Sequence, residues 1–289
     1  MTFSEYLDKH YSTKKKGNVG QIIRKCAFEH GYTCKSHAQS REHVIYGSDS
    51  FGREVVIKNT GENEIIALKA LQEHSNHVTL IDFFWATIHS DSAIIVLEQL
   101  SGDLINLVEL NGGRLTEYNA FRYLYQIVDA VNYLHEQQIY HRDIAPDNIL
   151  YDSKKDKVYL CDLGLVQINN TNTCTKPVGK ILYAAPELLL VSKGKENLFY
   201  SDKLDIWCIG CLLCYMIFGD MPWKKSSVEF HEYVFKKGNQ NNFSSYLKET
   251  HPHFEIGKYT RIFLNYILKE ESLHRPTSHG LMTGLEIIM

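Results

Sequence analysis

The residues of this chain whose types could do chemistry are three side chains with carboxylate or amide oxygens and one lysine. Asp143 and Asn148 lie five positions apart, and Asp162 follows nineteen residues after Asp143. Carboxylate and amide oxygens are ligands that Mg²⁺ prefers, and a well-placed carboxylate also accepts a proton. Lys58, at the end of an apolar run, adds a positive charge far upstream. Taken singly, an aspartate often caps a helix and a lysine often lies on the surface, so only their joint pattern indicates a site.

Four short motifs contain or follow these residues. In chain order they are Val55-Val56-Ile57-Lys58, His141-Arg142-Asp143-Ile144-Ala145-Pro146-Asp147-Asn148, Asp162-Leu163-Gly164 and Ala185-Pro186-Glu187. They resemble the strand-three lysine motif, the catalytic loop, the metal-binding Asp-Phe-Gly and the Ala-Pro-Glu of protein kinases. The resemblance extends from about residue 44 to residue 277, and four motifs in the right order are far more specific than any one of them.

The resemblance implies a role for each chemical group. Phosphoryl transfer is catalysed mainly by positioning and by neutralising charge on the phosphates of ATP. Lys58 then binds the α- and β-phosphates with Glu64 as its ion-pair partner, and Asn148 and Asp162 hold Mg²⁺. Asp143 is the catalytic base that accepts the proton of the substrate hydroxyl.

The segment that begins at Glu64 resembles the kinase helix that carries this glutamate. Only five residues separate Lys58 from Glu64, fewer than in most kinases. The helix must therefore begin almost at once, with Asn59 or Thr60 as its N-cap and Glu64 in its first turn. Glu62 is the alternative acid. A helix this short should be less free to swing out, which predicts weak regulation at this point.

The resemblance also places the adenine pocket. Residues 98–103 form the hinge, Leu97 is the gatekeeper, and backbone groups of Glu98 and Leu100 hydrogen-bond adenine. Asp103 meets the ribose. Three apolar side chains sandwich the adenine ring: Val44, Val56 and Leu150.

Two further matches are structural rather than chemical. Asp205 matches the buried acid that anchors the catalytic loop, and Arg275 matches the usual partner of Glu187. Small-molecule phosphotransferases with a similar core usually lack this second pair. The two matches therefore favour a protein kinase.

The phosphate-covering loop departs from the family pattern. Its three glycine positions hold His37, Gln39 and Glu42. Glycine lets backbone N–H groups approach phosphates closely, whereas these side chains hinder the approach and Glu42 adds a like charge. This departure is the main argument for the alternative function, a pseudokinase or weak ATP-binding scaffold.

A second departure lies in the catalytic loop, where Ala145 replaces the lysine usual in serine/threonine kinases. Lys180 in turn replaces a threonine that in the family lies beside the catalytic aspartate. Lys180 either reaches into the space that Ala145 leaves and restores the cation, or it points to solvent. Arg142 indicates a cationic pocket for a phosphate on the activation segment, which extends from Asp162 to Glu187. Three threonines are available as acceptors there: Thr171, Thr173 and Thr175.

The elements around these residues follow two periodicities. Short β-type runs come first, at residues 44–46, 54–58, 78–84 and 93–97. Helical periods dominate later, at residues 116–136 with Thr116 as N-cap, 201–218 and 259–268. This order predicts an α+β protein with the bilobal kinase fold: a small antiparallel N-lobe sheet with one helix, then a larger, mainly helical C-lobe.

The same resemblance divides the chain. Residues 1–35 are an N-terminal extension that caps the N-lobe, mediates dimerisation or is partly disordered. The kinase domain covers residues 36–289. Its parts are the N-lobe (36–97), the hinge (98–103) and the C-lobe (104–289).

The bulk composition excludes several classes of protein. Of 289 residues 44% are apolar and 22% charged, and the net charge of −3 gives no reason to expect nucleic acid or an anionic membrane as a partner. The polar N-terminus does not resemble a secretory signal, and no apolar stretch is long enough to span a membrane. Nothing indicates an oligomeric state.

Seven scattered cysteines predict reduced thiols and an intracellular, cytoplasmic protein, with the nucleus or the cytosol of a host cell as alternatives. Cys208, Cys211 and Cys214 are spaced like metal ligands, but they lie in an apolar helical run and are interpreted as buried small hydrophobes. The predicted function is transfer of the ATP γ-phosphoryl group to serine or threonine hydroxyls of protein substrates. Tyrosine specificity is a minor alternative.

Overall fold

The strand-like runs before residue 100 and the helical runs after it fold into two separate units of the computed structural model. The first unit ends at Leu100, and the second covers Ser101–Met289. The structure describes residues 19–35, 44–71, 75, 80–85, 92–168, 171–175, 178–190, 198–237 and 242–289, with only the backbone described for residues 80–85 and Ser92.

The first unit is built on a five-stranded antiparallel sheet with the order β1-β2-β3-β5-β4. β-Branched residues fill its central strands, as their strand propensity predicts. The predicted strands are confirmed, and β3 runs three residues past Lys58 because residues 59–61 pair with residues 92–94. The strands are β1 (Thr33–Cys34), β2 (Val44–Ser48), β3 (Glu54–Gly61), β4 (Leu80–Trp85) and β5 (Ser92–Glu98).

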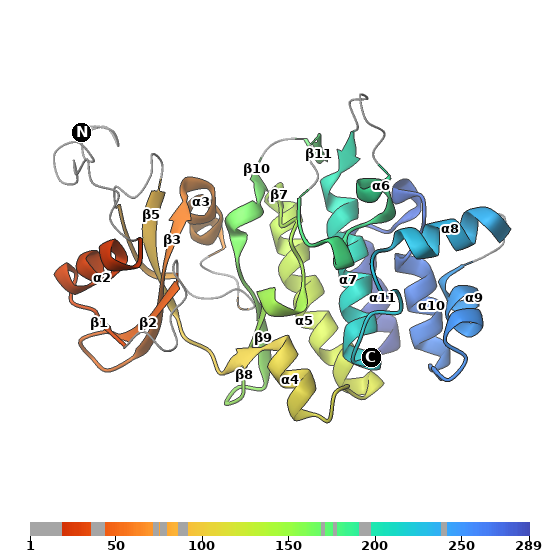
Figure 1. Cartoon of the computed structure of the whole chain (residues 1–289), viewed down its shortest axis with the longest axis horizontal. Coiled ribbons are helices and arrows are strands. Elements are labelled where there is room, and N and C mark those ends of the chain that lie inside the picture. The colour runs from red at the N-terminus through yellow and green to blue at the C-terminus, as the bar shows by residue number, and fades with distance from the viewer. Residues whose placement is uncertain are drawn as a thin grey trace. The chain divides into compact units, whose positions relative to one another are not determined.

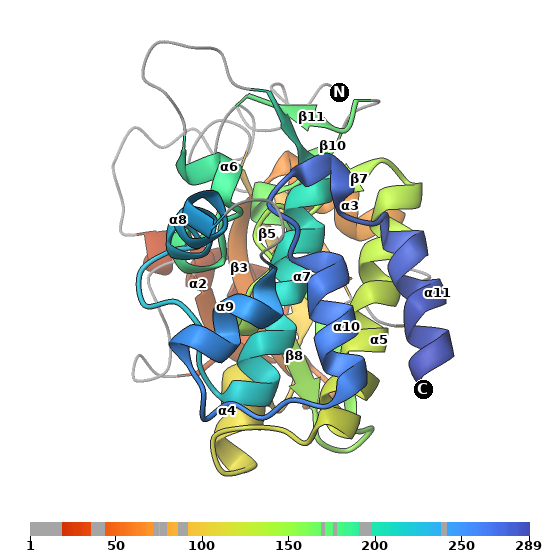
Figure 2. The same ribbon diagram turned by 90° about the vertical axis from the view of Figure 1, so that its right-hand side faces the viewer.

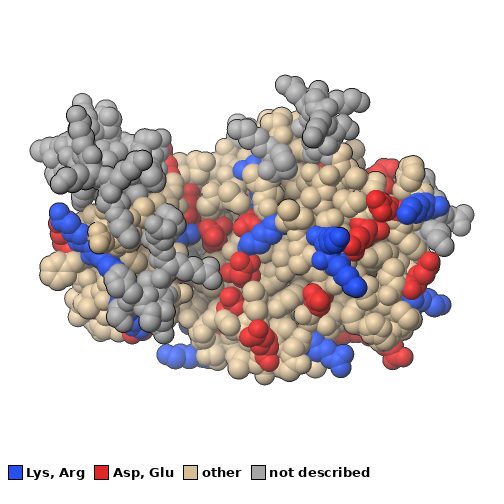
Figure 3. All heavy atoms as spheres, viewed as in Figure 1, with Lys and Arg blue, Asp and Glu red and all other residues tan. Residues whose placement is uncertain are grey.

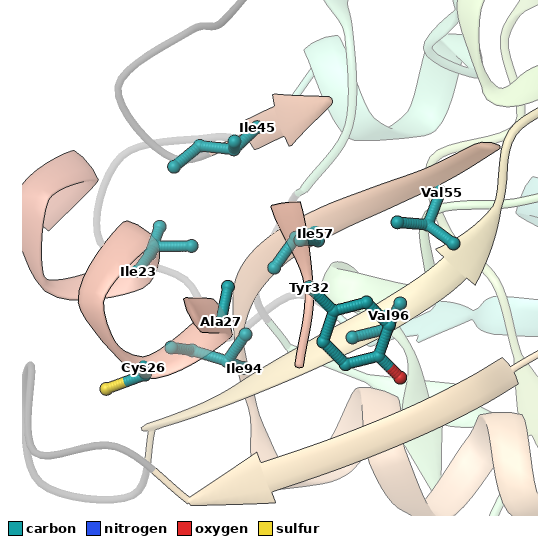
Figure 4. Packing of buried hydrophobic residues seen from close by; sticks show 9 residues of the cluster. All are labelled: Ile23, Cys26, Ala27, Tyr32, Ile45, Val55, Ile57, Ile94 and Val96. Carbon is teal, nitrogen blue, oxygen red and sulfur yellow. The ribbon is translucent and has the colours of Figure 1, made fainter. Parts of the chain in front are cut away.

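Helix α2 (Val19–Glu29) covers one face of this sheet (Figure 1). Its buried side chains pack on strand residues that alternate along β2, β3 and β5, so every second side chain of those strands enters the core (Figure 4). The described residues of the extension, 19–35, thus supply a helix that packs on the sheet and its edge strand β1. The core residues are Ile23, Cys26, Ala27, Tyr32, Ile45, Val55, Ile57, Ile94 and Val96.

Helix α3 (Glu62–Ala70) follows β3 directly and carries Glu64 in its first turn. The predicted N-cap was wrong. The N-cap is Gly61, which makes no side-chain capping hydrogen bond. Thr60 still belongs to the ladder of β3, so its hydroxyl donates to the Glu64 carboxylate instead of accepting a hydrogen bond from a helix N–H.

The second unit is mainly helical. Figure 2 shows α5, α7, α10 and α11 running side by side, with α7 in contact with α5 and α10. The predicted cap of α5 is confirmed, since the Thr116 hydroxyl accepts a hydrogen bond from Asn119 N at 3.3 Å. The helices are α4 (Leu104–Leu110), α5 (Glu117–Glu136), α6 (Pro186–Leu189), α7 (Ser201–Phe218), α8 (Val228–Lys237), α9 (Phe243–Thr250), α10 (Lys258–Ile267) and α11 (Ser278–Ile288).

Short strands and 3₁₀ turns connect these helices and carry the loops of the site. The strands are β6 (Gly102–Asp103), β7 (Ile139–Tyr140), β8 (Ile149–Asp152), β9 (Lys157–Leu160), β10 (Gln167–Ile168), β11 (Thr173–Cys174) and β12 (Phe199–Tyr200). The 3₁₀ turns are η2 (Pro146–Asn148), η3 (Leu163–Leu165), η4 (Ile181–Tyr183) and η5 (Ser272–His274).

Helix α7 is apolar on all sides and almost wholly buried. Cys208, Cys211 and Cys214 are buried within it as free thiols, and burial raises the pKa of each. In the described ranges, no group of three or more His, Cys, Asp or Glu side chains is placed to hold a metal. The interpretation of these cysteines as small core residues is confirmed. No helix in the described ranges is long and apolar enough to cross a membrane.

Candidate active site

In the first unit, Lys58 and Glu64 form a largely buried ion pair. The Lys58 ammonium lies 2.7 Å from Glu64 Oε1, with side-chain exposures of 14% and 2%. The other carboxylate oxygen of Glu64 accepts a hydrogen bond from the Thr60 hydroxyl. The alternative acid, Glu62, lies two residues earlier in α3 and is exposed. The short connection thus places the acid at the third helical residue, where the helix faces the sheet.

The sheet face that carries Lys58 is apolar around it. Strand register places Val44 opposite Lys58, and Leu97 opposite Val56. Directly paired residues of antiparallel strands point to the same face, so these four side chains share one surface. It is the face opposite to the one that α2 covers, and it provides a flat apolar platform beside a cation.

Sequence reasoning missed one member of this platform. Tyr46 pairs with Val56 in the β2–β3 ladder and is partly exposed on the same face. The signal was present in the sequence, because Tyr46 is two residues after Val44 and strand side chains alternate with a period of two. An aromatic ring here extends the platform along β2.

The segment predicted as the hinge leaves β5 after Glu98. Gln99 N donates to Glu54 O at 3.2 Å, so the backbone groups of Glu98 point away from β3. Asp103 caps α4: its carboxylate accepts from Asn106 N at 2.9 Å, and Asn106 Oδ1 accepts from Asp103 N at 3.1 Å. Leu150 lies in the second unit, opposite Asp103 in the β6–β8 ladder and partly exposed.

The catalytic-loop motif is held by the buried carboxylate of Asp205. Its two oxygens accept hydrogen bonds from His141 N at 2.8 Å and from Arg142 N at 2.7 Å. His135 Nε2 lies 2.9 Å from the same carboxylate. Arg142 adopts a positive φ of 65°, a conformation rare for a residue with a side chain and one that these bonds stabilise. The predicted anchoring role of Asp205 is confirmed, and His135 is a partner that the sequence did not reveal.

Asp143 and Asn148 are joined by direct hydrogen bonds. Asn148 Nδ2 donates to Asp143 O at 2.7 Å and to Asp143 Oδ2 at 2.9 Å. Because its amide nitrogen serves Asp143, Asn148 presents its amide oxygen to other groups. Burial raises the pKa of Asp143, and the negative charge of Asp162 adds to this effect.

Asp162 begins the 3₁₀ turn η3 in a left-handed conformation, with φ 60° and ψ 74°. Its Oδ1 accepts from Gly164 N at 3.4 Å, and its side chain is exposed. Asp162 and Asn148 therefore supply one carboxylate and one amide oxygen. Such a pair suits Mg²⁺, which is usually held by one or two protein oxygens together with the phosphates of a nucleotide.

Lys180 brings a cation to this cluster from the activation segment. Its ammonium lies 3.6 Å from Asp143 Oδ2 and 2.7 Å from Asp147 Oδ1, while the Ala145 side chain is fully buried. The preceding Gly179 has φ 95°, and a Cβ there would lie 2.8 Å from Arg142 O. Only glycine allows the segment to approach the catalytic loop so closely. The Lys180 ammonium is thus directed at the carboxylates of Asp143 and Asp147, while its role as a replacement cation stays a prediction.

The pair at the base of the activation segment is also formed. Arg275 Nη1 and Nη2 donate to the two carboxylate oxygens of Glu187 at 2.6 and 2.7 Å. The Arg275 guanidinium is buried and lies over the Trp207 ring, 4.8 Å from its centroid. The predicted partnership of Arg275 with Glu187 is confirmed.

The substituted glycine positions His37, Gln39 and Glu42 lie outside the described residues.

On the face shown in Figure 3, lysine and arginine side chains are interspersed with aspartate and glutamate.

Comparison with known proteins gives consistent results. Residues 25–284 match the family described as protein kinase domain. The chain is 35% identical over 230 residues to serine/threonine-protein kinase CHK1 of Saccharomyces cerevisiae, which covers 77% of this chain and 39% of that protein. It is 32% identical over 198 residues to serine/threonine-protein kinase PKH2 of the same yeast, covering 63% of this chain and 18% of the relative.

A third relative is the probable serine/threonine-protein kinase KIN1 homolog of Enterocytozoon bieneusi, 31% identical over 160 residues, or 55% of this chain and 25% of that protein. The chain thus spans less than half the length of each of these relatives.

Proposed function

The chain belongs to the protein kinase family, with serine/threonine kinases as its relatives, and we propose that it transfers the γ-phosphoryl group of ATP to serine or threonine hydroxyls of protein substrates. One observation carries this proposal: a partly buried aspartate, Asp143, is fixed by Asn148 and flanked by the ammonium of Lys180. The cluster contains a base, oxygen ligands for Mg²⁺ and a cation.

Each residue has a task in that reaction. Asp143 accepts the proton of the substrate hydroxyl, and burial makes it a stronger base than an ordinary carboxylate. Mg²⁺, bound with ATP, neutralises charge on the phosphates, and Asn148 and Asp162 are the residues that would hold it. Lys58, oriented by Glu64, binds the α- and β-phosphates.

Lys180 takes the place of the missing catalytic-loop lysine. Its ammonium reaches Asp143 from the activation segment, at the position where Ala145 cannot supply a charge. A cation beside the reacting groups stabilises the charge on the phosphoryl group during transfer. The position of the cation therefore depends on the activation segment and not on the catalytic loop.

For the nucleotide, the apolar platform of Val44, Tyr46, Val56 and Leu97 suits one side of the adenine ring. In the first unit the backbone groups of Glu98 and Leu100, and in the second unit Leu150 and the remaining carboxylate oxygen of Asp103, are the other groups proposed to bind the nucleotide. The capping bond made by Asp103 limits the freedom of its side chain to turn toward a ribose.

The alternative, a pseudokinase, is motivated by the glycine positions occupied by His37, Gln39 and Glu42. Against it stand four retained groups: Lys58, Asp143, Asn148 and Asp162. A chain that had lost catalysis would be free to lose the pairing of Asp143 with Asn148 as well.

The two functions are separated by measuring transfer of radiolabelled phosphate from ATP with Mg²⁺ to casein and histone. We expect incorporation by the wild type and a loss of about 10²- to 10⁴-fold in Asp143→Asn, which keeps the shape of the side chain but removes the base. Nucleotide binding by the wild type without any incorporation would establish the pseudokinase.

A further inference from the structure

The guanidinium of Arg142 is already bound within the second unit. Arg142 Nε donates to Leu165 O at 2.9 Å, and Nη1 donates to Gln167 Oε1 at 3.3 Å. The backbone of Arg142 is fixed in turn by Asp205, so the side chain leaves the catalytic loop in a defined direction. The cation that the sequence assigned to an incoming phosphate thus has internal partners.

Gln167 uses both ends of its amide to connect three segments. Its Oε1 accepts from Arg142 and from Ser201 Oγ at 2.9 Å, the latter at the start of α7. Its Nε2 donates to Thr171 O at 3.2 Å and to Thr173 O at 2.9 Å, both on the activation segment. One neutral side chain therefore links the catalytic loop, α7 and the activation segment.

A second set of hydrogen bonds holds the same stretch. β11 pairs with β12, with Thr173 opposite Tyr200. Ser201 N donates to Asn172 O at 2.6 Å, and Asn172 Nδ2 donates to Asp202 Oδ1 at 3.1 Å. Residues 171–175 are thus ordered by hydrogen bonds to backbone groups, to the Gln167 amide and to the Asp202 carboxylate, with no charge required on a threonine.

A phosphate in this place would meet unfavourable chemistry. A phosphothreonine carries a charge of about −1.5 to −2 and is stabilised by arginine clusters but destabilised beside aspartate. At Nε and Nη1 of Arg142 it would compete with Leu165 O and the Gln167 amide, and a phosphate on Thr173 would be attached next to Asn172, which binds the Asp202 carboxylate.

We propose that Gln167 is a positioning residue that does the work of an activation-segment phosphate, tethering the segment to the catalytic loop so that the kinase is active without phosphorylation of Thr171, Thr173 or Thr175. The inference rests on the proposed kinase function. Gln167 binds Arg142, the neighbour of Asp143, and it also holds the activation segment, which carries Lys180. Its loss should therefore lower turnover and leave the affinity for ATP unchanged.

The catalytic test uses the full chain, freed of phosphate with a phosphatase and checked by intact mass. We expect the dephosphorylated wild type and a Thr171→Val, Thr173→Val, Thr175→Val triple variant to phosphorylate a protein substrate at rates within about twofold of the untreated enzyme. Gln167→Ala should lower kcat about 10- to 100-fold with KM for ATP unchanged, because misplacing reacting groups costs rate rather than nucleotide affinity. Gln137→Ala, at an exposed glutamine after α5, is the matched control and should behave as the wild type.

A second readout does not depend on catalysis. Amide hydrogen exchange of residues 171–175 should be slow in the dephosphorylated wild type and fast in Gln167→Ala, at an unchanged unfolding temperature. Gln167→Glu keeps the shape and the bond to Arg142 but loses both donors to the threonine carbonyls, so it should also loosen this segment.

Two results would overturn the inference: activity that appears only after one of the three threonines is phosphorylated, or slow exchange retained in Gln167→Ala. If the wild type is inactive in every state but exchange changes as expected, the kinase proposal fails and the tether stands.

Discussion

Replacement of Lys180 by methionine tests the unusual part of the proposed mechanism. Methionine keeps most of the length of the side chain and removes only the charge. The ammonium lies 3.6 Å from Asp143 Oδ2, and two unit charges at that distance interact by roughly 4.6 kcal/mol at an effective dielectric constant of about 20. Because 37% of the Lys180 side chain is exposed, solvent screening reduces this value by half or more, to about 2 kcal/mol.

If the transferring phosphoryl group experiences the cation at a similar distance, Lys180→Met should lower kcat roughly 30-fold. KM for ATP should stay near the wild-type value, since Lys58, Asn148 and Asp162 are untouched. Lys180→Arg, which keeps the charge, should recover much of the rate. Steady-state kinetics with a protein substrate measures both constants.

The pH profile provides an independent check. Asp143 works as a base only when deprotonated, so the rate rises with pH as this carboxyl loses its proton. Lys180 lowers the pKa of Asp143 against the raising effect of burial. Removing the cation must raise that pKa, and the acidic limb of kcat/KM should move to higher pH in Lys180→Met. A kcat within threefold of the wild type together with an unmoved acidic limb would refute the reasoning.

Three other predictions concern packing around the site. Lys58→Met removes the ion-pair partner of the Glu64 carboxylate, which is 2% exposed and keeps its hydrogen bond from Thr60. The change should cost about 3–5 kcal/mol of unfolding free energy in urea titration, whereas adding Glu64→Gln should return part of it; equal stability of the single and double variants would contradict this. Arg275→Lys cannot reproduce the two hydrogen bonds to Glu187 at 2.6 and 2.7 Å and should lower the unfolding temperature, while the same change at the exposed Arg261 of α10 should not. Gly179→Ala introduces a Cβ 2.8 Å from a catalytic-loop carbonyl at a φ of 95°, so kcat should fall with little change in stability; full activity would show that the close approach is dispensable.

The chain order of the motifs was enough to predict the family and the two-part α+β fold, and it named most residues of the candidate site. The strand and helix periods gave the element types because burial on one face imposes a period of two or 3.6 residues. Thr116 was identified as a cap because that contact is local and reaches only three residues along the chain. Lys58 and Glu64 are close enough in sequence for their pairing to be inferred from length alone.

Where several contacts are possible for one side chain, the predictions from sequence were wrong or incomplete. Thr60 is a good capping residue by type, but its place in the β3 ladder turned its hydroxyl to Glu64. Tyr46 was not predicted as part of the apolar platform, although the two-residue period of a strand places it on the same face as Val44. The sequence also does not show that Gln167 accepts a hydrogen bond from Arg142, while the cationic pocket at Arg142 for a phosphate stays a prediction.

Residue types and spacing by themselves determined which chemical groups this protein has: a lysine, two aspartates and an asparagine in the order of a protein kinase. Only the tertiary structure decided where the second cation lies and how the activation segment is held. Lys180 and Asp143 are 37 residues apart, and Gln167 and Ser201 are 34 apart. Contacts over such separations form only when distant loops approach one another, as they do at Gly179 and at the short strand pairs. Local secondary-structure propensity does not specify that approach.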